Sequence, residues 1–123
     1  MTNLKFMVVD DSSLTRKKLV NIIKKMGYSV VCDAVDGVDA VEKYAKYQPD
    51  IVTMDINMPN MDGIEATKVI TKKFPNSKII MVTANGFDQT IFEAIEVGAK
   101  GYIIKPFNQL KIQEAVDSLF VGA

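Results

Sequence analysis

Residues 51–63 read Ile-Val-Thr-Met-Asp55-Ile-Asn57-Met-Pro59-Asn-Met-Asp62-Gly63. Four strand-forming residues run directly into a carboxylate, and the Pro, Asn, Asp and Gly residues that follow argue against a longer strand. The pattern predicts that Asp55 lies at the end of a buried strand and faces a loop. A buried carboxylate is costly to keep ionised unless it is solvated, paired with a cation or part of a functional site. On this stretch alone, an Asp that simply caps the loop is the plainer interpretation.

The rest of the chain repeats this alternation of short apolar runs and amphipathic segments. Apolar runs occupy residues 4–9, 30–32, 51–54, 79–82 and 102–104, and a segment with helical spacing follows each of them. Ser12 or Ser13 is expected to cap the first helix, and Gly27 to end it. The predicted inward residues are Leu19, Ile22, Ile23 and Met26; Val38, Val41 and Ala45; Ala66, Ile70 and Phe74; Ile91, Ala94 and Ile95; and Ile112, Ala115, Val116, Leu119 and Phe120.

Strands that are apolar along their whole length are those covered on both faces. Five strand-then-helix units therefore predict an α/β sandwich with a parallel five-stranded sheet at its centre. At 123 residues, the chain fits one domain, spanning residues 1–123.

Composition excludes several classes of function. Fifteen basic and fifteen acidic residues cancel, so we expect no direct binding to nucleic acid. No membrane-spanning run or signal peptide is visible, which predicts a cytoplasmic protein without membrane insertion. The absence of histidine excludes histidine-based catalysis and most zinc sites. Cys32 is expected to pack in the core, and the basic side of the first helix is expected to be a solvated face rather than a docking surface (Arg16, Lys17, Lys18, Lys24 and Lys25).

The groups suited to chemistry lie at or just beyond the ends of the predicted strands. Asp10 and Asp11 follow the first strand, Asp55 the third, Thr83 the fourth and Lys105 the fifth. All strands of a parallel sheet point the same way, so these residues are expected at one edge, where open α/β sheets bind ligands. In a flavodoxin-like strand order, 2-1-3-4-5, the first and third strands are neighbours, and Asp10, Asp11 and Asp55 would lie side by side.

Three adjacent carboxylates require a cation. Two unit charges about 4 Å apart repel by about 4 kcal/mol at an effective dielectric constant near 20. Mg²⁺ suits such a site because it takes one or two carboxylates with several waters and leaves room for a phosphate oxygen. Lys105 adds a second positive charge and Thr83 a hydroxyl donor. Taken singly, these two are better interpreted as a surface lysine and a strand-end threonine, but the whole constellation favours a site.

Six short motifs extend this pattern along the chain: Val8-Val-Asp-Asp-Ser12, Met54-Asp-Ile-Asn-Met-Pro59, Asp62-Gly63, Val82-Thr-Ala84, Gly98-Ala99 and Lys105-Pro106-Phe107. Each alone is weak, but all of them in this order and spacing are highly specific. Together they resemble the receiver domain of two-component response regulators, over essentially the whole chain. The resemblance implies the flavodoxin-like receiver fold, a doubly wound five-stranded parallel sheet in the order 2-1-3-4-5 flanked by five helices.

The resemblance also implies the roles of the acidic residues. Asp55 would be the phosphoacceptor. Asp11 and Asp55, with the backbone carbonyl of Asn57, would hold Mg²⁺, and Asp10 would help through water.

Four further features follow from the same resemblance. Thr83 and Lys105 would bind the phosphoryl oxygens, and the Lys105–Pro106 bond would be cis. Thr83 and Tyr102 would form the switch, because movement of Thr83 would open space for Tyr102, with an ordinary edge-strand aromatic as the alternative for Tyr102. Asn57 and Asn85 would flank the position of an attacking water.

A receiver of this kind would take its phosphoryl group from a sensor histidine kinase and rearrange the face formed by the fourth helix, last strand and last helix. It would be a signalling switch with at most slow self-phosphorylation and self-dephosphorylation, not an enzyme. The chain ends just after the last helix, so we expect a stand-alone monomer that serves chemotaxis and binds the flagellar motor switch, with a phosphatase as a further partner. A phosphorelay intermediate or a receiver of another pathway is the alternative.

Three other classes of protein compete with this interpretation. A haloacid-dehalogenase-type phosphatase also forms an aspartyl phosphate, but it usually places an acid-base Asp two residues after the nucleophile, where this chain has Asn57. A flavodoxin-like cofactor binder would follow its first strand with Ser, Thr and Gly, whereas Asp10 and Asp11 repel phosphate without a metal. The third is a receiver that forms one domain of a larger regulator.

Overall fold

The computed structural model describes residues 3–84 and 88–120. Within these residues, five strands alternate with five helices, as the sequence predicts. The strands are β1 (Lys5–Val9), β2 (Ser29–Ala34), β3 (Ile51–Asp55), β4 (Ile79–Thr83) and β5 (Gly101–Ile104). The helices are α1 (Ser13–Lys25), α2 (Gly37–Tyr47), α3 (Gly63–Lys73), α4 (Asp88–Glu96) and α5 (Gln109–Ser118).

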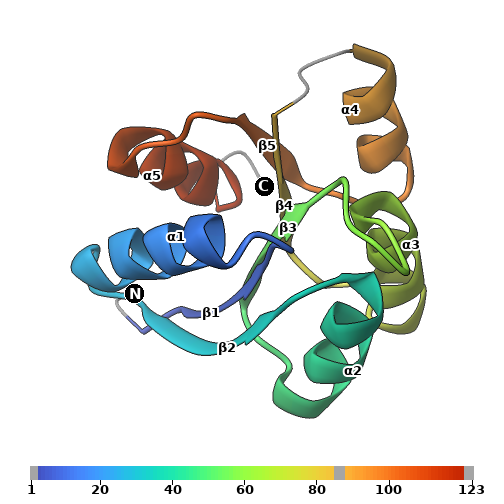
Figure 1. Ribbon diagram of the computed structural model, residues 1–123, viewed down its shortest axis with the longest axis horizontal. Coiled ribbons are helices and arrows are strands. Elements are labelled where there is room, and N and C mark those ends of the chain that lie inside the picture. The colour runs from blue at the N-terminus through green and yellow to red at the C-terminus, as the bar shows by residue number, and fades with distance from the viewer. Residues whose placement is uncertain (1–2, 85–87, 121–123) are drawn as a thin grey trace.

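The strands form one parallel sheet in the order β2-β1-β3-β4-β5, which confirms the order implied by the resemblance. Helices α1 and α5 cover one face, and α2, α3 and α4 cover the other (Figure 1). Strands β1 and β3 are neighbours, at the point where the chain's connections diverge to opposite sides of the sheet. The carboxyl ends of the strands share one edge, and ligands bind at such a point in open α/β sheets.

Each face of the sheet carries its own apolar core because successive strand residues point to opposite sides. In β1, Met7 and Val9 join the cluster under α2, α3 and α4, whereas Phe6 and Val8 join the cluster under α1 and α5. Every residue of β3 and β4 is buried. Burial on both faces explains why these strands read as continuous apolar runs.

The edge strands are less covered than their apolar sequences suggest. In β2, Val30, Val31 and Cys32 are only partly buried, and in β5 Tyr102 and Ile104 are exposed. An edge strand has a neighbour on one side alone, so the flanking helices shield it less. Cys32 nevertheless packs against the cluster under α2 and α3, in agreement with the predicted packing role, and burial raises the pKa of its thiol.

The apolar stripe predicted for α2 was wrong in two positions. Val38 and Ala45 were expected inward but are exposed, whereas Ala40 and Tyr44 are buried. The helix begins at Gly37, which is itself buried, and positions three and seven residues later share its face. The sequence pattern had the right period and the wrong phase.

Two other apolar residues expected inward are largely exposed. Ile95 of α4 is 45% exposed and Phe120 is 48% exposed. Helix α4 lies near the β5 edge, where there is less sheet to cover (Figure 1). Phe120 follows the last residue of α5, Ser118, and so leaves the helical stripe.

The ends of α1 agree with the sequence. Ser12 is the N-cap, and its hydroxyl accepts a hydrogen bond from the backbone N–H of Thr15 at 3.3 Å. Gly27 follows the helix with a φ of 91°, a conformation that favours glycine at a helix C-terminus. The N-cap at Ser12 ends the short loop between β1 and α1, which carries Asp10 and Asp11.

Candidate functional site

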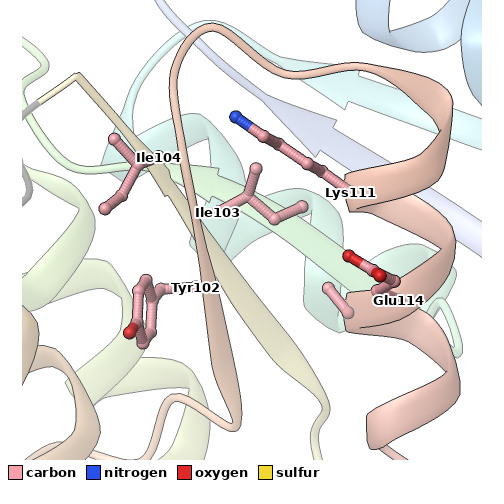
Figure 2. Close-up of a pocket in the computed structure, with 6 residues that line it drawn as sticks. Tyr102, Ile103, Ile104, Lys111 and Glu114 are labelled. Atoms are coloured by element: carbon pink, nitrogen blue, oxygen red, sulfur yellow. The ribbon is translucent and has the colours of Figure 1, made fainter.

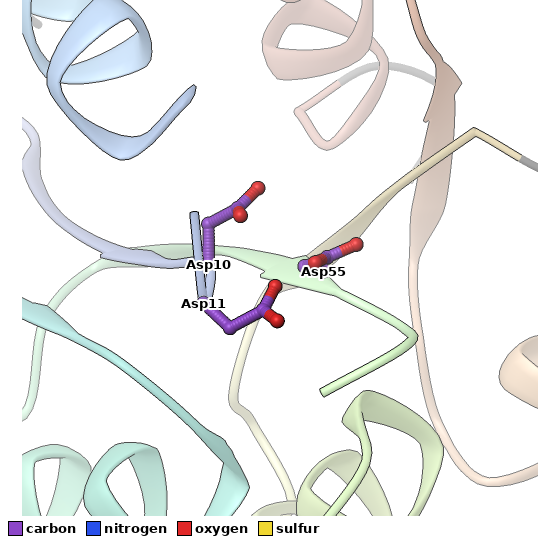
Figure 3. Close-up of side chains that lie close together, drawn as sticks. All are labelled: Asp10, Asp11 and Asp55. Atoms are coloured by element: carbon purple, nitrogen blue, oxygen red, sulfur yellow. The ribbon is translucent and has the colours of Figure 1, made fainter. Parts of the chain in front are cut away.

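Three carboxylates meet where β1 and β3 end side by side (Figure 3). Asp10 and Asp11 follow β1, and Asp55 is the last residue of β3. One oxygen from each lies within 4.8 Å of the other two. Asp10 and Asp55 are buried, at 2% and 6% exposure, whereas Asp11 is exposed. The structure therefore brings together the three residues that the sequence predicts to be adjacent, with Asp11 on the solvent side.

Lys105 brings a positive charge to the same edge. Its Nζ lies 3.2 Å from Oδ2 of Asp10 and 3.5 Å from Oδ1 of Asp55. Its backbone N–H donates to the carbonyl of Thr83 at 2.8 Å, which ties the end of β5 to the end of β4. Thr83 is buried, and the Lys105–Pro106 peptide bond is cis, as the resemblance implied. Lys105 and Thr83 thus reach the predicted edge together.

The charges at this site are not balanced by Lys105 alone. Burial raises the pKa of Asp55 from 3.8 to about 6, and repulsion from Asp10 contributes next. Lys105 opposes the rise, Asp11 adds to it, and the backbone N–H of Ile56, which donates to Asp55 Oδ1 at 2.9 Å, opposes it again. Three hard oxygen donors with an uncompensated negative charge are the donor set that suits Mg²⁺. The residues present therefore fit a hard divalent cation.

The loop from β3 to α3 is held tightly beneath the cluster. A Cβ atom on Gly63 would overlap the carbonyl oxygen of Asp55, so the helix start packs directly on the strand end. Farther along the loop, Asn60 has a φ of 68° and its amide donates to Oδ2 of Asp36 at 2.7 Å. This loop carries Asn57, whose side chain is exposed. The loop that carries Asn57 is thus closed by the packing of Gly63 on Asp55 and tied to Asp36 through Asn60.

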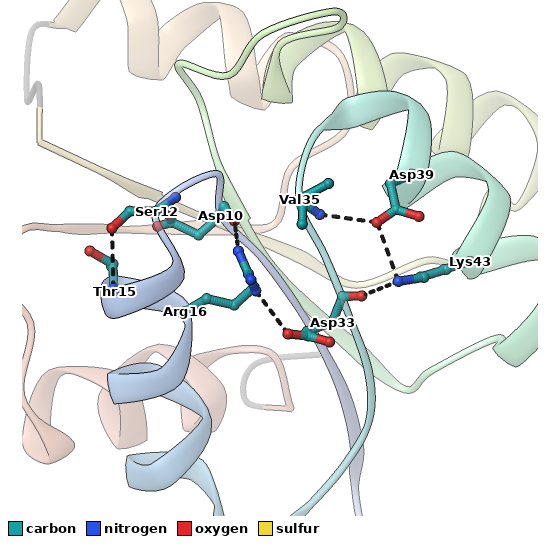
Figure 4. A network of polar contacts seen from close by, with 8 residues as sticks. All are labelled: Asp10, Ser12, Thr15, Arg16, Asp33, Val35, Asp39 and Lys43. Carbon is teal, nitrogen blue, oxygen red and sulfur yellow. Dashed lines mark hydrogen bonds and ion pairs between the residues drawn. The ribbon is translucent and has the colours of Figure 1, made fainter.

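Arg16 does not lie where its sequence pattern predicts. It was expected on the solvated face of α1, but its side chain is only 17% exposed and contacts Asp10 and Asp33 (Figure 4). The other basic residues of that face, Lys17, Lys18, Lys24 and Lys25, are exposed as predicted. The sequence does contain Asp33, a carboxylate that directly follows an apolar run, but it does not identify Arg16 as the partner of that carboxylate.

Tyr102, predicted as the switch aromatic, lies on β5 and is 48% exposed. It projects from the strand on the same side as Ile104, whereas Ile103 points toward α5 (Figure 2). A pocket of about 390 Å³ is lined by these three residues together with Lys111, Glu114 and Ala115. The role of Tyr102 stays a prediction.

Two further expectations can be compared with the described part of the chain. Asn85, expected beside the site, lies outside the described residues. Among the helices that the structure describes, none combines the length and the apolar character needed to cross a membrane.

Comparison with known proteins gives consistent matches. Residues 6–117 match the family model for the response regulator receiver domain. The chain is 48% identical over 113 residues to chemotaxis protein CheY of Thermotoga maritima, and the aligned residues cover 92% of this chain and 94% of that protein. It is 44% identical over 114 residues to chemotaxis protein CheY of Listeria monocytogenes, and these residues cover 93% of this chain and 96% of that protein.

A solved structure shares the fold closely. A chain in the crystal structure of the CheX-CheY-BeF3-Mg²⁺ complex from Borrelia burgdorferi superimposes with a TM-score of 0.93 at 38% identity. The match covers 97% of this chain and 90% of that chain.

Proposed function

The chain belongs to the response regulator receiver domain family, and we propose that Asp55 is its phosphoacceptor. Receiver domains are signalling switches rather than conventional enzymes, and the chain is closely related to the CheY chemotaxis regulators. One observation carries the proposal. The buried carboxylate of Asp55 ends β3 within 4.8 Å of the carboxylates of Asp10 and Asp11, with Lys105 Nζ 3.5 Å from its Oδ1.

Asp10, Asp11 and Asp55 would hold Mg²⁺, with the backbone carbonyl of Asn57 as a further ligand. Receiver domains bind this ion at an acidic pocket, and the three carboxylates form such a pocket here. When bound, Mg²⁺ compensates the negative charge of the carboxylates and of an incoming phosphate oxygen. The protein's own contribution is to keep the nucleophile, the lysine and the hydroxyl at fixed positions on one sheet edge.

In the transfer step, an oxygen of ionised Asp55 attacks the phosphorus of the donor. The new bond between oxygen and phosphorus gives an aspartyl phosphate, while the bond from phosphorus to the leaving nitrogen of a kinase phosphohistidine breaks. Lys105 and Thr83 donate hydrogen bonds to the phosphoryl oxygens, which carry the charge of the transition state. The position two residues after Asp55 holds Asn57, which cannot transfer a proton as an Asp there would. Self-phosphorylation and self-dephosphorylation are therefore slow.

The phosphoryl group changes the α4-β5-α5 face by drawing in Thr83 and Lys105. Hydrogen bonds to a charged group contribute about 1.5 to 3 kcal/mol each, so two of them approach the roughly 5.5 kcal/mol that inverts a 1:99 equilibrium. Lys105 directly follows β5, and Tyr102 lies within that strand. Movement of Lys105 toward the phosphoryl group would therefore reach the α4-β5-α5 face along β5.

Exposed apolar side chains support a docking role for the α4-β5-α5 face. Its large exposed apolar side chains are Phe92, Ile95, Tyr102, Ile104 and Leu110. We infer that a phosphorylated monomer binds its target here, the flagellar motor switch in chemotaxis, and that a sensor histidine kinase in the cytoplasm supplies the phosphoryl group. A phosphatase, or a partner similar to the CheX of the Borrelia complex, would be a further ligand of the phosphorylated form.

The proposal is tested by incubating the purified protein with Mg²⁺ and acetyl phosphate, then locating the adduct by intact mass and borohydride trapping. We expect a Mg²⁺-dependent adduct on Asp55 that hydrolyses slowly. The variant Asp55→Asn should form none, and Asp117→Asn, which changes an exposed carboxylate of α5, should label like the wild type. Full labelling of Asp55→Asn would refute the assignment, and rapid multiple turnover of the donor would indicate a phosphatase.

A further inference from the structure

Arg16 connects two strands at the loop that carries the acidic cluster. Its Nη1 donates to the backbone carbonyl of Asp10 at 2.8 Å, and its Nε donates to Oδ2 of Asp33 at 2.8 Å (Figure 4). The side chain thus links α1 to two strands, because it donates one hydrogen bond to the residue after β1 and one to a residue of β2. A guanidinium has several donors in a rigid fork, so it can hold both acceptors at once.

The bond to Asp10 acts on two site residues together. The carbonyl of Asp10 belongs to the peptide unit that joins Asp10 to Asp11, and this unit is planar. Fixing its oxygen therefore fixes the plane from which both carboxylates project. The N–H of Asp10 is bonded on the other side, to the carbonyl of Ala34 at 3.1 Å, and Asp10 is 2% exposed. Without Arg16, the buried carbonyl would lose this donor, and the loop would have to move to find another.

Asp33 is itself held in place from α2. Lys43 Nζ donates to the backbone carbonyl of Asp33 at 2.6 Å and pairs with Asp39 at 3.2 Å. Asp39 in turn accepts a hydrogen bond from the N–H of Val35 at 3.1 Å. Because the Asp33 side chain is 51% exposed, its ion pair with Arg16 adds little to stability. The pair is better suited to orient the guanidinium than to stabilise the fold.

We propose that Arg16 is a positioning residue for the divalent-cation site, and that Asp33 acts on that site through Arg16. The inference deepens the proposed function and rests on it, because it assumes that the three carboxylates bind Mg²⁺. Groups that orient metal ligands commonly change metal affinity 10- to 100-fold when they are removed, although they do not touch the ion.

Charge and position predict opposite effects of removing Arg16. A cation near three carboxylates competes with Mg²⁺, so loss of its charge alone would tighten Mg²⁺ binding. Loss of positioning would weaken it. The direction of the change in affinity therefore separates the two roles.

The test is a Mg²⁺ titration followed by NMR on the amide signals of the acidic cluster, because the chain contains no Trp to report binding. We expect Arg16→Met to weaken Mg²⁺ binding by about 10-fold or more. Arg16→Lys, which keeps the charge without the fork, should recover part of the loss. Lys17→Met removes one charge from an exposed neighbour on α1 and should bind Mg²⁺ at least as tightly as the wild type.

A double-mutant cycle tests the role of Asp33. If Asp33 acts through Arg16, the variant Asp33→Asn should weaken binding, and the double variant should bind Mg²⁺ no more weakly than Arg16→Met. Additive losses would overturn this part, because independent charge effects add. Thermal unfolding without metal checks that each variant folds. If Arg16→Met does not fold, the two single variants Arg16→Lys and Asp33→Asn decide the question, because each should still weaken Mg²⁺ binding.

Two outcomes separate this inference from the proposed function. Folded Arg16→Met that binds Mg²⁺ as tightly as the wild type, or more tightly, overturns the positioning role alone. A wild-type protein that binds no Mg²⁺ overturns both the metal site and this inference.

Discussion

Lys105 Nζ lies 3.5 Å from Oδ1 of Asp55, so the protein itself supplies a cation beside the proposed nucleophile. Lys105 lowers the pKa of Asp55, but burial and the repulsion of Asp10 raise it by more, so that the pKa is about 6. The site therefore has a surplus of negative charge at neutral pH. That surplus opposes folding and favours a divalent cation, and both effects can be measured.

The first prediction concerns stability against pH without metal. The folded pKa of Asp55 is about 6 and the ordinary value is 3.8, so the folded state holds this proton more tightly. Between these values the unfolding free energy falls as pH rises, and the loss persists above pH 6. Each pKa unit is worth about 1.4 kcal/mol, which gives a cost on the order of 3 kcal/mol.

We therefore expect Asp55→Asn to be more stable than the wild type at pH 7, by up to about 3 kcal/mol, and equally stable below pH 4. Urea unfolding in the presence of a chelator measures the difference across this range. Asp117→Asn should differ little from the wild type throughout. A variant Asp55→Asn without added stability at pH 7 would contradict the charge surplus.

The second prediction concerns the gain in stability on metal binding. A ligand that binds only the folded state adds about 2.7 kcal/mol at a concentration 100 times its Kd. We expect Mg²⁺ to raise the unfolding free energy of the wild type and to have little effect on Asp11→Asn, which lacks the negative charge of the exposed carboxylate. Urea unfolding at pH 7 with and without Mg²⁺ gives both values, with Asp117→Asn as the control that keeps the gain. An equal gain in Asp11→Asn would place the ion elsewhere.

The third prediction separates phosphoryl acceptance from the switch. Lys105→Met removes a cation that competes with Mg²⁺, so Mg²⁺ should bind more tightly, and the pKa of Asp55 should rise further. The Asp55 adduct can still form, but β5 loses the contact that draws it toward the phosphoryl group. The NMR signals of Tyr102 should then shift on phosphorylation in the wild type and in Lys100→Met but not in Lys105→Met. Equal shifts in Lys105→Met would show that the lysine does not couple the two regions.

The sequence predicts the sheet and the site for the same reason. Apolar runs without alternation indicate parallel strands covered on both faces, and parallel strands place their carboxyl ends together. Asp10, Asp55 and Lys105 could therefore be assigned to one edge without coordinates. The strand order that makes Asp10 and Asp55 neighbours required the family resemblance, because periodicity contains no information about order.

Features that depend on distant contacts could not be predicted. Helical periodicity places Arg16 of α1 among lysines, and its partner Asp33 lies 17 residues away on strand β2. Only the register of β1 against β2 brings the two together. The phase of α2 likewise depends on Gly37, whose N–H donates to the carbonyl of Met61 at 2.9 Å across the sheet edge.

The last prediction concerns Gly63, where the start of α3 packs directly on the end of β3. A Cβ atom at this position would overlap the carbonyl of Asp55, and backbone cannot yield as a flexible side chain does. The N–H of Gly63 also donates to the carbonyl of Ile56 at 2.7 Å, so the loop has no slack. Forcing extra atoms into a packed core commonly costs about 1 to 3 kcal/mol, and a clash with backbone belongs at or above the upper end.

We expect Gly63→Ala to lose about 3 kcal/mol or more of unfolding free energy and to accept phosphoryl groups more slowly, since the displaced carbonyl belongs to Asp55 itself. Gly101→Ala is the matched control, because a Cβ atom there has nothing within 4 Å. It should change stability by less than about 1 kcal/mol and leave labelling by acetyl phosphate intact. Urea unfolding and intact mass measure the two properties on the same samples. If Gly63→Ala and Gly101→Ala were equally stable and labelled at the same rate, the tight contact between Gly63 and Asp55 would have no part in setting the site.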